Sequence, residues 1–457
     1  MSRLCTPSAT LLLILLFSLF AVGQPAIFAS VEASTTSWSY AYGGVDYDNG
    51  YSVATCSAGG FITAGYTQSF SQSYIDLWVV RITEAGQVLW HQSYGGQEWD
   101  EDTWSPWTQG ATGWFSIIQC QAGGFAITGQ TPYEPGLWDY GGPRNDLWLV
   151  RLDETGTMLW NQTYGGIGED WGNGVIECSD GGFLAAGMTR SFDFHEGELL
   201  LIRYDQNGQE MWHRYYGGPH KDSAYSLVEC QEGGFAVVGY TKQSTQAEPA
   251  DCWLLRVDQD GAMLWNRTYG GLGDDQGFSI VECEEGGFAI AGYTEIGDDR
   301  QMWILRTDAS GTPLWENTFG GPDVDQGHAI IKYSAGGFVL AGFSLSNGPG
   351  TADVFVVGVS ESGELQWSRI YGGPQDDFAF SLVESSNAEL VIAGSTKSYG
   401  AGDADLWVIR VPPNSPQPTM YNVLGQLLAS AAILATIIVL VIAFALVYRK
   451  KKYAASL

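Results

Sequence analysis

Apolar residues in this chain gather in short runs that are rich in β-branched and aromatic side chains and are separated by glycine-rich stretches. The unit that begins at residue 269 shows the pattern, with the runs GFSIVEC, FAIAGYT, MWILRTD and LWENTFGG in succession. Such runs, bounded by Gly, Asn and Asp, are typical of β-strands joined by tight turns. The 60 glycines and the 13% aromatic content fit an all-β protein and do not fit a helical one.

The four-strand unit recurs along the chain. Its marker is the tripeptide Tyr/Phe-Gly-Gly, which begins at 42, 94, 164, 216, 269, 319 and 371. All but one of the intervals between these markers are close to 50 residues. Repeats of this length with four strands each are typical of β-propeller blades, which pack side by side around a central channel.

The two ends of the array fix the number of blades at seven. Six units finish with a strand that carries a tryptophan, at Trp90, Trp160, Trp212, Trp265, Trp315 and Trp367. The seventh unit stops after its third run, DLWVIR (405–410), and the missing strand stands in front of the array as WSYAYGG with Trp38. We therefore predict an all-β, seven-bladed propeller over 38–411 whose N-terminal strand closes the last blade and removes an exposed sheet edge.

The repeated pattern YGGxxxDxGxxxxxCxxGGFxxAGYT, followed by DLWLVRLDxxGxxLWxxTYGG, resembles the seven-bladed β-propeller repeat known as SBBP, found in surface and secreted proteins of bacteria and archaea. The resemblance covers nearly all of 38–411. It implies the propeller scaffold and a surface or secreted location. It implies no particular activity, because the family is defined by its scaffold.

The two ends of the chain have the composition of targeting and membrane segments. Residues 1–29 combine one basic residue, Arg3, with an apolar stretch, as a signal peptide does. Residues 423–448 carry no charge over a length that spans a bilayer, and the basic tail 449–457 follows at once. We expect a single-pass protein of the cell membrane with the propeller and the Pro-rich linker 412–422 outside and the C-terminus in the cytoplasm.

Charge narrows the class of partner. The chain has 51 acidic and 21 basic residues, and five of the basic residues lie in the two end segments. The exterior part therefore carries a net charge of about −35, which repels nucleic acid and anionic lipid. We expect an extracellular glycan or protein ligand and no nucleic acid.

Insertions in the second unit point to one face of the propeller. When the strands of a blade are lettered A to D outward from the channel, the D–A and B–C loops share one face, here called the DA–BC face. The A–B and C–D turns share the opposite AB–CD face. The second unit is lengthened in its D–A loop, QEWDEDTWSPWTQGATGW, and in its B–C loop, QTPYEPGLWDYGGPRN, so both insertions lie on the DA–BC face.

Tryptophans concentrate on the same face. Six of them stand outside the repeated strand positions, in these loops and in the next D–A loop: Trp99, Trp104, Trp107, Trp114, Trp138 and Trp171. Amphipathic aromatic side chains in surface loops indicate a docking patch for a sugar ring or a protein partner. The alternative is that they pack on one another as a rigid cap.

An acidic ring is also predicted on the DA–BC face. Each unit places an aspartate four residues after its Gly-Gly pair: Asp48, Asp100, Asp170, Asp222, Asp275, Asp325 and Asp377. An aspartate at the entry to a strand often caps its own turn, which is the interpretation we favour for the ring. Clustered carboxylates also suit hard cations, so the alternative is a Ca²⁺ site at the channel mouth. No other cofactor is indicated.

Other residues at repeated positions are predicted to be structural. Five cysteines at the end of strand A should fill core space: Cys56, Cys120, Cys178, Cys230 and Cys283. Arginines of strand C should pair between blades: Arg81, Arg151, Arg203, Arg256, Arg306 and Arg410. Glycines of strand B should let neighbouring blades approach closely: Gly65, Gly129, Gly187, Gly239, Gly292, Gly342 and Gly394.

No signature of catalysis stands out. The histidines are scattered, and there is no nucleophile elbow, P-loop or dinucleotide fingerprint, so no catalytic residue is assigned. We predict a membrane-anchored cell-surface binding or adhesion module that presents one propeller face to an extracellular glycan or protein ligand. The first alternative is a glycan-cleaving surface enzyme, a glycosidase or lyase that uses loop carboxylates. The second is a structural component of a surface layer.

Overall fold

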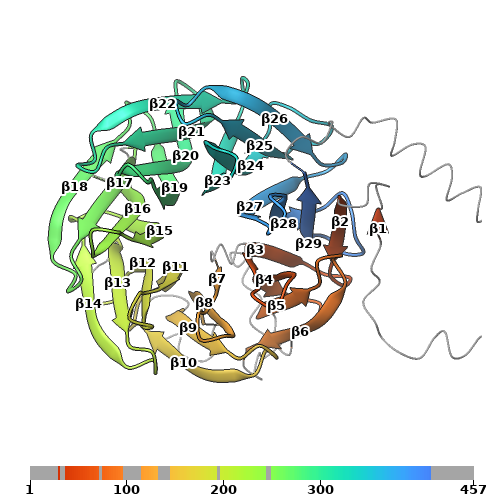
Figure 1. Cartoon of the computed structure of the whole chain (residues 1–457), viewed down its shortest axis with the longest axis horizontal. Helices are drawn as coiled ribbons and strands as arrows, with labels where there is room; N and C mark the ends of the chain where they lie inside the picture. Colours follow the sequence, from red (N-terminus) through yellow and green to blue (C-terminus); the bar gives the residue numbers. More distant parts are fainter. Residues whose placement is uncertain are drawn as a thin grey trace, which may run out of the picture. The chain divides into compact units, whose positions relative to one another are not determined.

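The chain folds into seven antiparallel sheets arranged around a central channel, as Figure 1 shows. The prediction of a seven-bladed all-β propeller is therefore confirmed. The computed structural model describes residues 29–30, 37–71, 75–95, 115–131, 145–192, 196–242 and 249–412.

Six blades are built from four consecutive strands, with strand A at the channel and strand D at the rim. Blades I to III are β3 (Asp48–Thr55), β4 (Phe61–Thr67), β5 (Asp76–Ile82) and β6 (Val88–Tyr94); β7 (Ser116–Gln119), β8 (Phe125–Gln130), β9 (Leu147–Leu152) and β10 (Met158–Tyr164); and β11 (Asp170–Glu177), β12 (Phe183–Thr189), β13 (Glu198–Tyr204) and β14 (Glu210–Tyr216). Blades IV to VI are β15 (Asp222–Glu229), β16 (Phe235–Thr241), β17 (Asp251–Val257) and β18 (Met263–Tyr269); β19 (Asp275–Glu282), β20 (Phe288–Ile296), β21 (Asp299–Thr307) and β22 (Pro313–Phe319); and β23 (Asp325–Lys332), β24 (Phe338–Ser344), β25 (Asp353–Val359) and β26 (Leu365–Tyr371).

Blade VII is assembled from both ends of the propeller. Its strands A to C are β27 (Asp377–Glu384), β28 (Leu390–Thr396) and β29 (Asp405–Val411), and its strand D is β2 (Trp38–Tyr42). The two parts pair antiparallel, with Trp38 opposite Arg410 and Tyr42 opposite Leu406, so the predicted closure is confirmed. A short fifth strand, β1 (Ala29–Ser30), lies beside β2.

A β-bulge interrupts the pairing of strands A and B in six blades, and the repeated glycine of strand B lies beside it. A Cβ atom on Gly65 would lie 1.8 Å from the carbonyl oxygen of Asn49 in its own blade. Five other glycines meet strand A in the same way: Gly187, Gly239, Gly292, Gly342 and Gly394. The tightest approach at these glycines is therefore between two strands of one sheet. The predicted approach of neighbouring blades is also present at some of them, since a Cβ on Gly172 of blade III would lie 2.9 Å from the carbonyl oxygen of Gly129 in blade II.

Tryptophans and phenylalanines fill the junctions between blades. The indole of Trp38 in blade VII lies 6.5 Å from the ring of Phe61 in blade I, and Trp160 lies 5.7 Å from Phe183 in the next blade. The strand C tryptophans are buried: Trp78, Trp148, Trp253, Trp303 and Trp407. The cysteines predicted for the core are also buried, and burial raises the pKa of Cys56, for example, to about 12. These thiols stay protonated and act as small apolar side chains.

The tyrosine of the Tyr-Gly-Gly marker joins consecutive blades. The hydroxyl of Tyr42 donates a 2.7 Å hydrogen bond to the carbonyl oxygen of Gly86 in the C–D turn of blade I. Tyr269 makes the same contact to Gly311 at 2.6 Å. Tyr94 and Tyr216 make the same bond to Gly156 and Gly261, so four junctions share it. These four tyrosine rings are buried, so each hydroxyl needs this partner.

The strand C arginines act mainly within their own blades. The guanidinium of Arg81 donates to the carbonyl oxygens of Phe61 and Ile82 at 3.2 and 2.5 Å, both in blade I. These carbonyls lie next to the A–B hairpin, where the guanidinium satisfies acceptors beside the turn. The prediction of pairing between blades was wrong for five of the six arginines. Within the described residues only Arg410 reaches a neighbouring blade, where it pairs with Glu84 at 2.8 Å.

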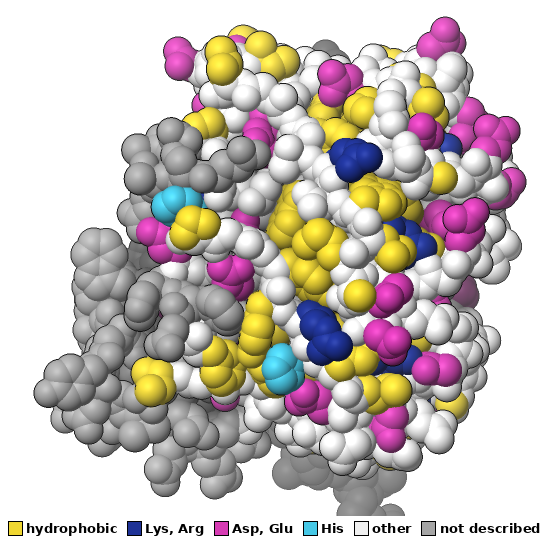
Figure 2. Space-filling view, turned by 90° about the vertical axis from the view of Figure 1, so that its left-hand side faces the viewer, with side chains coloured by type: hydrophobic (Ala, Val, Ile, Leu, Met, Phe, Trp, Pro, Cys, Tyr) yellow, Lys and Arg dark blue, Asp and Glu magenta, His cyan; other side chains and the backbone are white. Residues whose placement is uncertain are grey.

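The rim of the propeller exposes repeated apolar side chains, which Figure 2 shows in yellow between acidic and basic ones. Five aliphatic residues of strand D are 56–58% exposed: Leu89, Leu159, Met211, Leu264 and Leu314. The guanidinium groups of Arg214 and Arg267 lie over the indoles of Trp212 and Trp265, each at 5.6 Å. Cation–π contacts of this kind cover part of the apolar rim.

The predicted signal peptide, linker, transmembrane segment and cytoplasmic tail lie outside the described residues, apart from Ala29 and Pro412. In the described part of the chain, no helix has the length and apolar character needed to cross a membrane.

The junction between blades VII and I can be tested with Tyr42→Phe. Loss of the hydroxyl leaves the Gly86 carbonyl without its donor, so we expect a loss of about 1–2 kcal/mol in the free energy of unfolding. Chemical denaturation measures this change. The control Tyr47→Phe, on a side chain that is 39% exposed, should leave stability unchanged. Equal losses in both variants would contradict a role for the closing hydrogen bond.

Candidate functional site

The two faces of the propeller differ in the regularity of their loops. All seven A–B hairpins close with the same pair of backbone hydrogen bonds, such as those between Cys56 and Gly60 and between Gly59 and Cys56. Six C–D turns share a second repeated pattern. The B–C loops, in contrast, range from two residues at 297–298 to 16 at 131–146. Variation between blades is therefore concentrated on the DA–BC face, as expected when a rigid scaffold presents functional loops.

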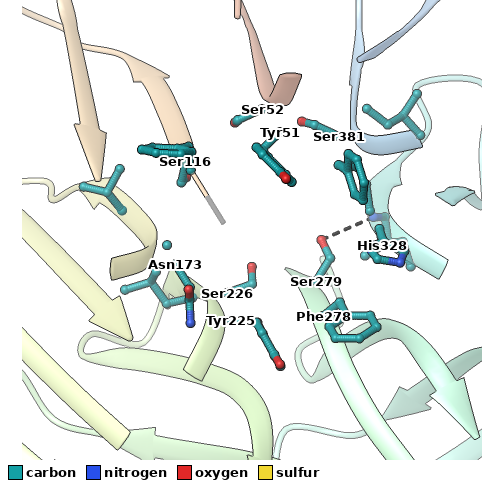
Figure 3. A pocket seen from close by; sticks show the side chains of 18 residues that line it. Tyr51, Ser52, Ser116, Asn173, Tyr225, Ser226, Phe278, Ser279, His328 and Ser381 are labelled. Atoms are coloured by element: carbon teal, nitrogen blue, oxygen red, sulfur yellow. Dashed lines mark hydrogen bonds between the residues drawn. The ribbon is translucent and has the colours of Figure 1, made fainter. Parts of the chain in front are cut away.

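One residue from each blade faces the central channel and together they form a ring: Tyr51, Phe115, Asn173, Tyr225, Phe278, His328 and Phe380. Six of them are the extra residues of the strand A bulges, and a bulge re-aims a side chain. Figure 3 shows the labelled members of this ring around the opening.

Aromatic contacts link most of the ring. The centroid distance is 4.9 Å between Tyr51 and Phe380, 4.9 Å between Tyr225 and Phe278, and 4.9 Å between Phe278 and His328. Burial lowers the pKa of His328 to about 3, so its imidazole is neutral at physiological pH. The channel wall is therefore uncharged at this level and combines aromatic rings with hydroxyl and amide groups.

Small residues follow the ring and connect the blades. The hydroxyl oxygens of Ser52 and Ser381 accept backbone N–H bonds from Ile117 and Val53 of the next blade, each at 3.1 Å. The space inside the wall is about 160 Å³, enough for roughly five water molecules. A cavity of this size admits a single side chain, and a larger ligand would have to bind at the channel mouth.

The described aspartates of the predicted ring are turn caps. Asp48 is fully buried, and its carboxylate accepts bonds from the backbone N–H of Gly44 at 2.7 Å and the hydroxyl of Ser69 at 2.6 Å. The bond to the glycine four residues earlier recurs in five other blades, through Asp170, Asp222, Asp275, Asp325 and Asp377. The favoured interpretation as caps is consistent with these contacts, and the carboxylates face their own turns rather than solvent.

A second carboxylate stands beside the cap at several junctions. A Cβ atom on Gly43 would lie 1.9 Å from Oδ1 of Asp405 and 2.9 Å from Oδ2 of Asp48, so the two carboxylates approach the same glycine. Burial raises the pKa of Asp405 to about 6, and the charge of Asp48 adds to the shift. Asp353 has a pKa of about 6 for the same main reason, with Asp377 as its neighbour. The strand C members of these pairs were not recognised in the sequence, although an acidic residue recurs at the start of strand C.

These pairs are not an obvious catalytic or metal site. Both Asp405 and Asp48 are at most 1% exposed, and the arrangement recurs around the ring, as expected for a structural element. Among the described residues, no three His, Cys, Asp or Glu side chains gather around a common point that could hold a metal ion.

Trp171 is the one predicted site tryptophan that falls within the described residues. It is half-buried on β11, where the guanidinium of Arg190 lies 5.6 Å and the ammonium of Lys221 lies 5.7 Å from its ring centroid. The other predicted members lie outside the described residues: Trp99, Asp100, Trp104, Trp107, Trp114 and Trp138. The structure also places the channel ring near this face. The sequence did not reveal the ring, because its members occupy the same position in the strand A bulge but are of different residue types.

No family model matches the chain, and no curated protein matches it in sequence. Similar solved structures include Sqt1 from Chaetomium thermophilum, with 13% identity, a TM-score of 0.44 and coverage of 76% of this chain and 80% of that one. The WD40 domain of Neurospora crassa Pan2 has 10% identity, a TM-score of 0.46 and coverage of 80% and 90%. Drosophila Semaphorin 1b, extracellular domains 1–2, has 9% identity, a TM-score of 0.42 and coverage of 85% and 87%. The resemblance to SBBP repeats stays a prediction.

The raised pKa values of Asp353 and Asp405 predict an unusual pH dependence. Their folded pKa of about 6 exceeds the unfolded value of about 3.9, so the folded state binds these protons more tightly. Their contribution to stability is complete below the unfolded pKa and is lost as the pH rises through 6. We expect thermal stability to increase from pH 7.5 to pH 5, by about 1 kcal/mol for each group after allowance for solvent screening.

The double variant Asp353→Asn/Asp405→Asn provides the control. It removes both titrations, so the increase in stability between pH 7.5 and pH 5 should become smaller by about 2 kcal/mol when unfolding is followed by calorimetry at several pH values. The part of the increase that comes from Glu198, whose pKa burial raises to about 7, should remain. A wild-type protein that loses stability over this interval would contradict the proposed effect of the carboxylate pairs.

Proposed function

We propose that this chain is a binding or adhesion module that a C-terminal helix holds at the cell surface and that presents its DA–BC face to an extracellular glycan or protein ligand. The observation that carries the proposal is the difference between the two faces. The AB–CD face repeats the same short turns, whereas the DA–BC face holds the loops that vary in length and chemistry. Binding residues are commonly placed on such loops around a rigid scaffold.

The path of the chain supports the same orientation. In blade VII, β29 runs from Asp405, which pairs with Thr396 at the B–C loop, to Val411, which pairs with Leu390 beside the A–B turn. The chain therefore leaves the propeller on the AB–CD face. The linker 412–422 spans at most about 36–40 Å before the proposed membrane helix. The proposal therefore has the AB–CD face near the membrane and the DA–BC face pointing outward.

Binding is favoured over glycan cleavage by the accessibility of the carboxylates. A glycosidase needs two carboxyl groups that reach the scissile bond from either side. The paired carboxylates Asp48 and Asp405 are buried at a blade junction and hydrogen-bonded to their turns. Among the described residues, these pairs are placed to stabilise the ring rather than to contact a substrate.

The proposal is tested by screening the purified full-length chain on a glycan array, with and without Ca²⁺, while products of any bound glycan are monitored. We expect binding without turnover. Turnover would instead support the glycan-cleaving alternative, and the absence of any binding to glycans would move the proposal to a protein ligand.

Replacement of Trp99, Trp104 and Trp107 by alanine should abolish that binding and shift the Tm by less than about 2 °C, because loop aromatics supply contact area without supporting the blades. A matched control replaces three exposed rim residues, Leu89, Leu159 and Leu314, by alanine and should retain binding. A large fall in Tm in the tryptophan variant would contradict the docking patch and favour the rigid cap.

A further inference from the structure

A backbone hydrogen bond brings two loop residues together on the DA–BC face of most blades. The residue that follows strand B donates its N–H to the carbonyl oxygen of the residue that precedes the cap aspartate. The bond joins Arg190 to Glu169 in blade III at 2.9 Å, Lys242 to Lys221 in blade IV at 3.2 Å, and Lys397 to Asp376 in blade VII at 2.9 Å. The side chains at these two positions are therefore neighbours, and the repeats allow their charges to be compared.

In three blades the charged side chains at this position form ion pairs. Arg190 forms an ion pair with Glu169 in blade III, and Lys397 pairs with Asp376 at 2.9 Å in blade VII. Blade V has two acidic residues here, Asp274 and Glu295, and Arg300 contacts both at 3.3 Å. The fold thus supplies a counterion where these loops carry charge.

Blade IV departs from this rule. Both positions are lysines, Lys221 and Lys242, and neither ammonium forms an ion pair with a described residue. Burial lowers the pKa of Lys221, and the positive charges of Arg190 and Lys242 lower it further, with only Glu169 opposing them. Two adjacent cations without a counterion among the described residues are destabilising, and this occurs in a chain whose net charge is −30.

Aromatic rings and a guanidinium hold these cations in place. The ammonium of Lys221 lies 5.7 Å from the ring centroids of both Trp171 and Tyr240, so it is fixed between blades III and IV. Arg190 lies over the same Trp171 ring, and its Nε is buried without a hydrogen-bond partner in the described structure. The cluster therefore has a fixed position, an excess of positive charge and an unsatisfied donor.

We propose that Lys221, Lys242 and Arg190 form an anion-binding site on the DA–BC face and that its ligand is a carboxylate-bearing, acidic segment of a polypeptide partner. The inference rests on the proposed function in that it places the ligand on the same face. In this cluster three cations face the single carboxylate of Glu169, so an excess of positive charge remains. Carboxylates complement that excess, and charge-assisted hydrogen bonds to them are stronger than neutral ones.

The surroundings favour a polypeptide over a sugar. Tyr240 is 4% exposed, and Arg190 and Lys221 both lie over Trp171, which leaves little open aromatic surface for a sugar ring to stack on. Tyr240 contacts the channel-lining Tyr225 at 5.8 Å, so the cluster is continuous with the cavity wall. The cavity of about 160 Å³ is smaller than typical ligand pockets but has room for one side chain next to the bound acid.

The test measures binding of a fluorescein-labelled hexaglutamate peptide to the purified full-length chain by fluorescence anisotropy at low salt. We expect binding that weakens as NaCl is added, because screening reduces the attraction between the charges. Lys242→Glu should weaken binding at least about tenfold. Lys397→Glu is the matched control, with the same charge change at the same repeat position of blade VII, and should change the affinity less than about twofold.

Lys221→Glu separates binding from folding. It places an acid beside Lys242, as in blades III and VII, so it should abolish peptide binding while the Tm stays the same or rises. Loss of binding together with a lower Tm would overturn the idea that the two lysines are an uncompensated pair held for a ligand.

Three other results would overturn the inference. The first is the absence of peptide binding, and the second is equal weakening of binding by Lys242→Glu and Lys397→Glu. The third is that tetragalacturonate binds more tightly than the peptide and that Lys242→Glu abolishes this binding. The third result would assign the site to an acidic glycan. If the peptide does not bind but the tryptophan variant still loses surface binding, this inference fails and the proposed function stands. If Lys242→Glu selectively loses the peptide while the glycan screen detects no binding, the anion-binding site stands and the glycan part of the proposed function fails.

Discussion

The pairing of β2 with β29 is the contact on which the rest of the propeller depends, because it joins the two ends of the array without a covalent bond. Five residue pairs complete blade VII and give it the rim strand that the other blades obtain from consecutive sequence. The tyrosine of this strand then makes the same bond to blade I that Tyr269 makes to blade V. Closure also brings the start of β2 and the end of β29 to the AB–CD face.

The repeats provide an internal standard for separating structure from function. A residue that recurs with the same contacts has a structural role, because each blade needs those contacts to fold. Examples are the contact of Asp48 with Gly44 and that of Arg81 with the hairpin carbonyls. A departure from the repeat needs another explanation. Lys221 is such a departure, since its equivalents Glu169 and Asp376 are acidic and paired. The ion pairs at this position in blades III, V and VII set the two lysines of blade IV apart.

Much of the fold could be predicted from sequence because periodicity and strand patterns are local signals. The number of blades, the closing strand, the buried tryptophans and the caps at positions such as Asp48 followed from spacing alone. The role of Arg81 was misassigned and the tightest contact of Gly65 was missed because sequence shows that a residue repeats but not whether it faces its own blade or the next one. The channel ring and the Lys221–Lys242 pair require the bulge and the register between strands A and B, which no single run of residues reveals.

The central claim is that ring closure directs the chain ends to one face and leaves the opposite face for ligands. The most direct test inserts one epitope tag at either of two sites in blade VI of the full-length chain and measures antibody binding to intact cells. One site is the B–C loop between Asn347 and Gly348, and the other is the C–D turn between Ser362 and Gly363. The proposed orientation predicts strong labelling at the first site and weaker labelling at the second, which it directs toward the membrane. Stronger labelling at the C–D turn would contradict it.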